Sequence, residues 1–268
     1  MPAAERTVQI SGSTVIVRPT AEAASRVAAD AIADIIQSAV KARGKAVLGL
    51  ATGATPEVVY ADLAARHEAG GLSFRNVVTY NLDEYYPIQP LDPRSYRAYM
   101  HRHLFSRVDI PPNRAHVLDG TVPEAFVADH AAQFDRWIEA DGGLDVQLLG
   151  IGRNGHIGFN EPNDRPVADF AAVPTRLVDL HPVTKADAVR EFGAEEDVIP
   201  RALTMGVKSI LAARAVVMLA TGPHKAAIVA QALRGPVTSA VPASLLQTIA
   251  DRVVWILDEL AAAEIGSS

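Results

Sequence analysis

The segment GIGRNGHIGFNEP, residues 150–162, places one histidine and one carboxylate within a glycine-rich turn. His156 is the only side chain of this segment that titrates near neutral pH, and Asn154 and Glu161 are neighbours that could orient it. A histidine held in this way can move protons during a reaction. A lone histidine is more often structural, so the glycines and Glu161 are what favour a catalytic interpretation.

The same segment matches the G-x-G-x-x-G pattern of dinucleotide sites at Gly150, Gly152 and Gly155. Such a site needs a strand, a tight turn and then a helix whose N-terminus meets the pyrophosphate. Gly158 weakens a helix in this region and Pro162 would break it. The pattern therefore predicts an ordered loop after a strand, and it disfavours a nucleotide site.

A second segment, LATGATPEVVY, is typical of a strand that leads into an anion site. Gly53 permits a sharp turn, and we expect Thr55 to cap a helix that has Pro56 in its first position. Backbone N–H groups at such a helix start bind anions, and the hydroxyl groups of Thr52 and Thr55 add donors. A capped helix without a ligand is an equally good interpretation of this segment alone. The lysine of nucleoside triphosphate loops is missing, so a sugar phosphate is the simpler anion.

The segment TGPHKAA repeats this pattern, with Gly222 leaving a strand and Lys225 in the first helical turn. A cation at a helix N-terminus opposes the helix dipole unless an anion lies between it and the amide groups. A surface lysine with a solvated ammonium is the alternative. We predict that Lys225 contacts the same anion.

The segment NLDEYY, residues 81–86, places Asp83 on one face of an extended chain and Glu84 on the other. One carboxylate therefore faces the site. At a strand end with restricted solvation, Asp83 could act as a general base. Two solvated loop acids are the alternative interpretation.

Metal chemistry is not predicted. His101 and His103 are two residues apart, and such residues do not share a face of a helix. The chain contains no cysteine, which excludes disulfides, thiolate catalysis and cysteine-ligated metals. The lack of cysteine is also typical of a cytoplasmic protein.

Short apolar strands alternate with longer helical patterns along the chain. Strands are expected at residues 14–17, 46–50, 77–82, 146–149, 176–180, 215–220 and 252–257, and helices at residues 21–42, 56–68, 95–105, 124–140 and 224–233. This alternation predicts an α/β fold, an open and mostly parallel sheet with helices on both faces, in a Rossmann-like three-layer arrangement. Ligands of such sheets bind outside the carboxyl ends of the strands, so the four loops predict one composite pocket.

The composition fits a single globular domain that spans residues 1–268, with 49% hydrophobic and 21% charged residues. The formal net charge of −6 gives no electrostatic basis for binding nucleic acid or an anionic membrane. The apolar stretch 209–221 is interrupted by Arg214 and is shorter than the ~20 residues that cross a bilayer. The N-terminal residues do not resemble a secretory signal, and we expect a cytoplasmic protein.

Taken together, LGLATGATP, NLDEYY, GIGRNGHIGFNEP, ALTMG and GPHKA resemble the glucosamine-6-phosphate deaminase family, whose members are also called glucosamine-6-phosphate isomerases. The similarity covers residues 46–247 in the expected order, and FNEP directly after GHIG is its most specific part. The related 6-phosphogluconolactonases share the fold and a similar glycine-histidine turn but lack this continuation. The resemblance therefore favours the deaminase branch.

The resemblance implies conversion of glucosamine 6-phosphate and water into fructose 6-phosphate and ammonia, with neither a metal nor an organic cofactor. It implies that His156 opens the sugar ring with help from Glu161 and Asn154, and that Asp83 moves a proton between C2 and C1. Glu84 would assist Asp83 from a second layer. The implied phosphate contacts are Thr52, Gly53, Ala54, Thr55, Arg190 and Lys225.

Two site positions depart from the family pattern. Asn154 stands where many members have aspartate, and Ala54 replaces the usual second glycine of the phosphate loop. Asparagine can still hydrogen-bond, and alanine keeps its N–H donor. Residues 163–205 are expected to form a mobile lid. Because the family includes monomers and hexamers, a homo-oligomer is one of the expected states.

Three other functions are compatible with the sequence. The same chemistry on galactosamine 6-phosphate, or on another amino-sugar phosphate, is one, because no identified residue fixes the stereochemistry at C4. A 6-phosphogluconolactonase-like hydrolase is the second, and a non-catalytic sugar-phosphate sensor is the third. The residues before Ala46 leave no room for a DNA-binding helix-turn-helix. The expected partner is therefore an amino-sugar phosphate, and neither nucleic acid nor a membrane.

Overall fold

A computed structural model describes residues 5–266 of the chain, except for the side chains of residues 190 and 191. Its main sheet contains β1 (Arg6–Ile10), β2 (Ser13–Arg18), β3 (Ala46–Leu50), β4 (Val77–Asn81), β6 (Ala115–His116), β7 (Val146–Leu149), β10 (Val216–Ala220) and β11 (Val253–Asp258). The strand order is β1-β2-β11-β10-β7-β3-β4-β6. β1 pairs antiparallel with β2, and the other pairings are parallel. The predicted open, mostly parallel sheet is confirmed.

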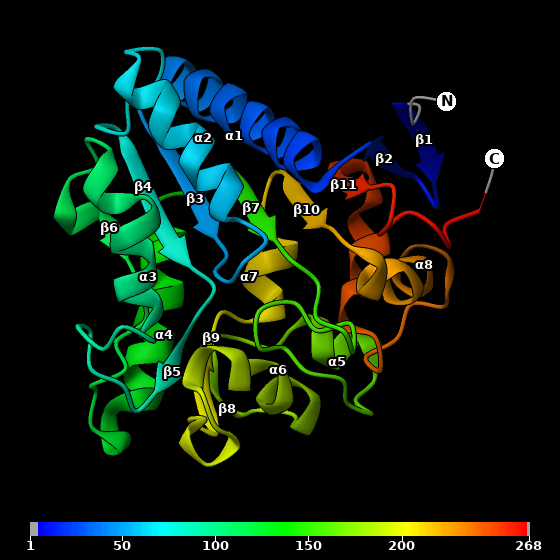
Figure 1. Cartoon of the computed structure of the whole chain (residues 1–268). Coiled ribbons are helices and arrows are strands. Elements are labelled where there is room, and N and C mark those ends of the chain that lie inside the picture. Colours follow the sequence, from blue (N-terminus) through cyan, green and yellow to red (C-terminus); the bar gives the residue numbers. More distant parts are fainter. Residues whose placement is uncertain (1–4, 267–268) are drawn as a thin grey trace.

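Helices cover both faces of this sheet, as expected (Figure 1). The α-helices are α1 (Ala21–Arg43), α2 (Glu57–Glu68), α3 (Tyr96–His103), α4 (Val127–Ala140), α5 (Val167–Ala171), α6 (Pro182–Phe192), α7 (Val207–Leu211) and α8 (Ala226–Arg234). The 3₁₀ helices are η1 (Phe105–Arg107), η2 (Pro112–Arg114), η3 (Glu124–Phe126), η4 (Glu195–Asp197), η5 (Pro223–Lys225) and η6 (Pro242–Arg252). None of the described helices is long and apolar enough to cross a membrane.

The longest helix, α1, has local signals at both ends. The Thr20 side chain accepts a hydrogen bond from the Ala23 N–H and caps the first turn, and Gly44 ends the helix with φ +76°. Between them, Ile32 and Ile36 lie fully buried on the face that packs against β2, β3, β10 and β11. Burial of this face holds β3 together with the strands on the other side of β7, namely β10, β11 and β2.

The order in which successive strands are added to the sheet reverses between β3 and β7. α1 and α2 connect strands that progress from β2 to β3 and then to β4. Later connections return from β4 through β7 and β10 to β11, and right-handed crossovers place their helices on the opposite face. Because β3 and β7 are neighbours, the reversal opens a crevice at their carboxyl ends. This geometry positions the site.

A second, smaller sheet was not predicted. It contains β5 (Asp83–Tyr86), β8 (Arg176–Asp179) and β9 (Arg201–Thr204), all antiparallel in the order β5-β9-β8. The strand expected at residues 176–180 was assigned to the parallel sheet, and that assignment is wrong. β8 is partly exposed along its length, whereas β3, β7 and β10 are buried throughout. Strands buried on both faces are typical of a parallel sheet, and β8 is not one.

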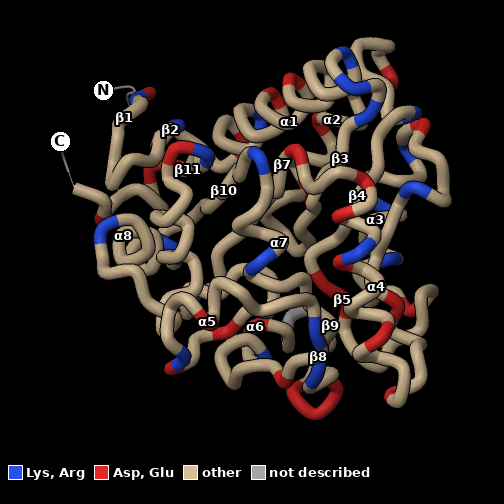
Figure 2. The backbone as a smooth tube through the Cα atoms, turned by 180° about the vertical axis from the view of Figure 1, so that it is seen from behind, with Lys and Arg blue, Asp and Glu red and all other residues tan. Residues whose placement is uncertain are grey.

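Charged residues of both signs are interspersed along the described chain (Figure 2). Many of them form surface ion pairs, for example Arg26 with Glu22 on α1. This mixture of positive and negative side chains accords with the modest net charge of −6.

Close approach of two loops makes Gly206 sensitive to substitution. A Cβ atom at Gly206 would lie 2.2 Å from the Val173 carbonyl oxygen and 2.3 Å from the Pro174 carbonyl carbon. Both contacts are backbone atoms, so we expect Gly206→Ala to lower the free energy of unfolding by about 1–3 kcal/mol. Urea denaturation measures the change.

Gly71→Ala is the matched control, because its Cβ would meet only the Arg66 carbonyl oxygen at 3.6 Å. We expect its effect to stay within about 0.5 kcal/mol. Equal effects of the two substitutions would contradict the packing described around Gly206.

Candidate active site

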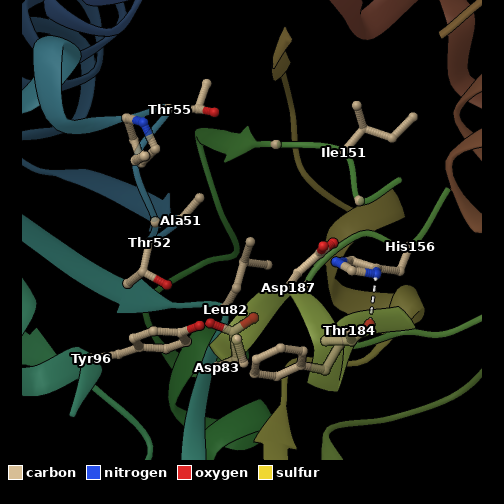
Figure 3. A pocket seen from close by; sticks show the side chains of 18 of the residues that line it. Ala51, Thr52, Thr55, Leu82, Asp83, Tyr96, Ile151, His156, Thr184 and Asp187 are labelled. Atoms are coloured by element: carbon tan, nitrogen blue, oxygen red, sulfur yellow. Dashed lines mark hydrogen bonds between the residues drawn. The ribbon is translucent and has the colours of Figure 1, made fainter. Parts of the chain in front are cut away.

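A cavity of about 230 Å³ lies at the carboxyl ends of β10, β7, β3 and β4 (Figure 3). The loops that follow these four strands line it, which confirms the prediction that they form one composite pocket. The polar and charged side chains of its lining are Thr52, Thr55, Asp83, Tyr85, Tyr96, His156, Thr184, Asp187 and Lys225.

The anion loop follows β3. Gly53 has φ +99°, a conformation that glycine adopts without strain. Two tyrosine hydroxyls hold the carbonyl groups of this loop, because Tyr60 donates to the Ala51 oxygen and Tyr99 donates to the Gly53 oxygen at 2.6 Å. Tyr99 comes from α3, so a distant helix fixes the conformation of the loop. No local sequence signal predicts this role of Tyr99.

The expected cap of α2 is wrong. The helix begins at Glu57, Pro56 occupies the N-cap position with φ −80°, and no described side chain caps the first turn. The helix starts one residue later than a Thr55 cap requires, so the Thr55 side chain does not serve as the cap. First-turn N–H groups that no side chain caps are suited to bind an anion.

Lys225 ends the 3₁₀ turn η5, after β10, and lines the same cavity. Its Nζ atom donates a hydrogen bond of 2.7 Å to the Ile151 carbonyl oxygen, and its burial lowers the pKa of the ammonium. The interpretation as a solvated surface lysine is therefore wrong. Arg190 belongs to α6, but its side chain lies outside the described residues.

The structure brings together the three polar residues predicted in the turn after β7. The His156 Nδ1 atom lies 3.3 Å from Glu161 Oε2, and the Asn154 side-chain amide donates to the same oxygen at 2.9 Å. The Asn154 Oδ1 atom accepts a hydrogen bond from the His156 N–H. Gly152 makes room for the imidazole, since a Cβ atom there would lie 2.3–2.4 Å from the ring. The turn thus presents the histidine and fixes its carboxylate partner.

Thr184 is a member of this group that the sequence analysis missed. Its hydroxyl donates to Glu161 Oε1 at 2.6 Å and lies 3.3 Å from His156 Nδ1. The residue lies on α6, more than twenty positions after Glu161, and no local motif marked it. Only the packing of α6 over the turn brings it to the site.

Glu161 is ionised at neutral pH although it is largely buried. Burial alone would raise its pKa, but hydrogen bonds and charge from His156, and hydrogen bonds from Thr184 and Asn154, outweigh that effect. Together they lower the pKa of Glu161 to about 2. The carboxylate therefore stays available to stabilise a protonated His156.

The two adjacent acids of β5 point to opposite sides, as the alternation of an extended chain predicted. Asp83 is 5% exposed and lines the cavity, whereas Glu84 is 1% exposed and lies at the start of α3. Glu84 accepts hydrogen bonds from the Ser95 hydroxyl and from the N–H groups of Tyr96 and Arg97. Burial raises its pKa despite these bonds. Glu84 therefore anchors the helix that carries Tyr99.

Aromatic rings form one wall of the cavity. The rings of Tyr96 and Phe159 are stacked at a centroid distance of 6.1 Å, and Tyr85 lies 4.9 Å from Tyr96. Tyr96 and Phe159 were not among the predicted site residues, because in the sequence they look like ordinary apolar positions. These rings line the same cavity as Asp83.

The described residues contain no group of three or more His, Cys, Asp or Glu side chains placed to hold a metal ion. His103, one of the two histidines of α3, packs its ring against Tyr99 at 4.3 Å. This contact gives His103 a structural role beside the anion loop.

Comparisons with known proteins agree with this geometry. A sequence model of the family described as "Glucosamine-6-phosphate isomerases/6-phosphogluconolactonase" matches residues 19–255. A glucosamine-6-phosphate deaminase of Rhodopirellula baltica is 45% identical over 86% of this chain and 89% of its own length. Glucosamine-6-phosphate deaminase 2 of Bacillus subtilis is 41% identical over 88% of this chain and 92% of its own.

Solved structures give the same result. The structure of a monomeric glucosamine-6-phosphate deaminase matches with a TM-score of 0.86 and 37% identity, over 93% of this chain and 99% of the other. A 6-phosphogluconolactonase of Trypanosoma brucei matches with a TM-score of 0.76 over 97% of this chain and 100% of the other. Its identity is 19%, so that likeness shows the fold alone. The resemblance found in the motifs is confirmed.

The low pKa of Glu161 predicts a pH-dependent stability. In an unfolded chain the pKa of a glutamate is about 4.3, so the folded protein gains stability above that pH and loses it as the pH falls towards 2. We expect this group to account for about 1–2 kcal/mol of the fall in unfolding free energy between pH 5 and pH 3. Glu161→Gln should lack that part of the fall, as measured by urea denaturation at both pH values.

Glu264→Gln, at an exposed position near the C-terminus, serves as the control and should keep the dependence of the unsubstituted protein. An identical acid-induced fall in the Glu161→Gln variant would show that His156, Thr184 and Asn154 do not hold Glu161 as described.

Proposed function

The chain belongs to the glucosamine-6-phosphate isomerase/6-phosphogluconolactonase family, and on that premise we propose that it is a glucosamine-6-phosphate deaminase. The enzyme converts glucosamine 6-phosphate and water into fructose 6-phosphate and ammonia. Relatives at 41–45% identity that cover more than four fifths of the chain bear the name of this activity. The lactonase likeness, at 19% identity, extends to the fold.

One observation carries the assignment of the site. A single cavity is lined by the anion loop and Lys225 and also by Asp83 and His156. A six-carbon sugar phosphate needs these two regions at once, since its phosphate and its reacting carbons lie at opposite ends of the chain. The arrangement supports a substrate held by its phosphate while protons move at C1 and C2.

Binding is proposed to begin with the phosphate group. The N–H groups of residues 52–55, the hydroxyls of Thr52 and Thr55, and Lys225 would hold the dianion. Arg190, whose backbone lies on α6, is proposed to add a further charge. The phosphate does not react, so its binding energy fixes the position of the sugar for the later steps.

Ring opening is assigned to His156. The imidazole would take the proton of the C1 hydroxyl and return a proton to the ring oxygen, which gives the open-chain aldehyde. Glu161 is ionised and stabilises the protonated imidazole during this transfer. Asn154 is neutral and binds Glu161, so it orients the pair without adding a charge.

Isomerisation is assigned to Asp83. The carboxylate would remove the proton from C2, which lies next to the C1 carbonyl, and return it to C1 through an enolamine, while a proton of the substrate ammonium passes to the C1 oxygen. The resulting C2 imine takes up water and releases ammonia, which leaves the ketone of fructose 6-phosphate. The aromatic wall beside Asp83 keeps bulk water from the enolamine. Glu84 holds α3 and touches neither substrate nor reacting atoms.

The finer predictions from the sequence also belong to this proposal. Residues 163–205 contain α6, which lines the cavity with Thr184 and Asp187, and this supports a mobile lid over the substrate. We propose a cytoplasmic location. The oligomeric state is open to either outcome, and the similar solved structure is of a monomeric deaminase.

The activity is tested by ammonia release from the purified protein with glucosamine 6-phosphate and galactosamine 6-phosphate in parallel. We expect release from glucosamine 6-phosphate. Release from galactosamine 6-phosphate alone would move the assignment to the other amino sugar. Absence of ammonia release from both substrates would contradict the proposal. Hydrolysis of 6-phosphogluconolactone by the same preparation tests the lactonase alternative.

The role of Asp83 gives a separate prediction. Asp83→Asn keeps the shape of the side chain but removes the base, so we expect turnover to fall by about 10²–10⁴-fold. Substrate binding, measured by calorimetry, should persist. Asp129→Asn, at an exposed position on α4 outside the cavity, should leave both quantities unchanged. Loss of substrate binding in the Asp83→Asn variant would instead assign Asp83 to holding the ligand.

A further inference from the structure

A second cavity of about 520 Å³ adjoins the first at its phosphate end. The two share residues 53–55, Asp187 and Lys225, and the second adds Arg153 and His224. Arg153 lies in the turn that presents His156, and Asp187 lies on α6. The neighbourhood of the anion loop therefore contains an arginine and an acid to which neither the resemblance nor the proposed mechanism assigns a role.

Arg153 and Asp187 form a two-point ion pair. Arg153 Nη2 lies 2.5 Å from Asp187 Oδ1, and Arg153 Nε donates to Oδ2 at 3.1 Å. A guanidinium binds carboxylate and phosphate with the same planar pair of donors. The side chains are 48% and 43% exposed, so water screens the pair and holds it weakly.

Asp187 lines the cavity, and its carboxylate is directed into it (Figure 3). An acid here is unexpected, because a phosphate dianion would be repelled by it. Burial and the charge of Arg153 lower the pKa of Lys225, and the negative charge of Asp187 raises it. Asp187 thus balances two cations, Arg153 and Lys225, when no substrate is bound.

We propose that Asp187 is the resident counter-anion of the phosphate site and that Arg153 is a further phosphate-binding residue. On substrate binding, the Arg153 guanidinium leaves the Asp187 carboxylate and binds the phosphate. This inference rests on the proposed function, since it deepens the description of the same site. Thr184 holds α6 to Glu161, so Asp187 stays close to the bound phosphate and weakens its binding.

The alternative is a structural ion pair that fastens α6 to the catalytic turn. The two explanations predict different effects of the two substitutions on phosphate binding. A counter-anion competes with phosphate, so removal of Asp187 strengthens phosphate binding, whereas removal of Arg153 weakens it. A structural ion pair is broken by removal of either partner, so both substitutions would weaken phosphate binding.

The test compares Asp187→Asn with Arg153→Gln in the full-length protein. Calorimetry with inorganic phosphate gives the dissociation constant, and initial rates give KM for glucosamine 6-phosphate. We expect Asp187→Asn to lower both constants and Arg153→Gln to raise both, each by about three- to tenfold, a modest change for a half-exposed charge. The double variant should lie nearer the unsubstituted protein than the Arg153→Gln variant does.

Glu22→Gln and Arg26→Gln are the matched controls, because that exposed ion pair lies on α1, outside both cavities. They should leave the dissociation constant for inorganic phosphate unchanged. Thermal unfolding of every variant checks that it is folded. Weaker binding in both Asp187→Asn and Arg153→Gln, or no change in either, would overturn the proposal. Absence of ammonia release by the unsubstituted protein would overturn the proposed function alone. The calorimetric measurement with phosphate does not depend on turnover, so it still shows whether the two substitutions change the dissociation constant in opposite directions.

Discussion

The buried, ionised carboxylate of Glu161 is the contact on which the site depends. A carboxylate in a largely buried position is costly unless donors surround it, and here the donors come from two places. His156 and Asn154 belong to the turn after β7, whereas Thr184 lies on α6 and the His181 N–H lies at its N-cap. One charge therefore joins the imidazole of the turn to the helix that lines the cavity.

That contact is possible because of how the main sheet is connected. The reversal of the strand order between β3 and β7 places four strand-end loops around one crevice. The smaller antiparallel sheet then pairs Asp83 of β5 with Thr204 of β9, so the proposed base is fixed by ladder hydrogen bonds rather than by a free loop. The parallel layer supplies the anion loop, and the antiparallel layer supplies the carboxylate.

Much of this arrangement followed from local sequence signals. Buried runs such as residues 46–50 and 146–149 identified strands, and the two-residue alternation separated Asp83 from Glu84. The contacts of Thr184 and Tyr99 could not be predicted, because they join segments that are far apart in the chain. The antiparallel sheet was missed for the same reason, since strand pairing depends on partners that no short window contains.

The position of Glu84 directly after Asp83 has a consequence for how the cavity lining is held together. Glu84 holds the start of α3, α3 carries Tyr99, and Tyr99 fixes Gly53 in the anion loop. Asp83 and the anion loop are thereby linked through two adjacent residues and one short helix. A displacement of the start of α3 would reach both of these parts of the cavity lining together.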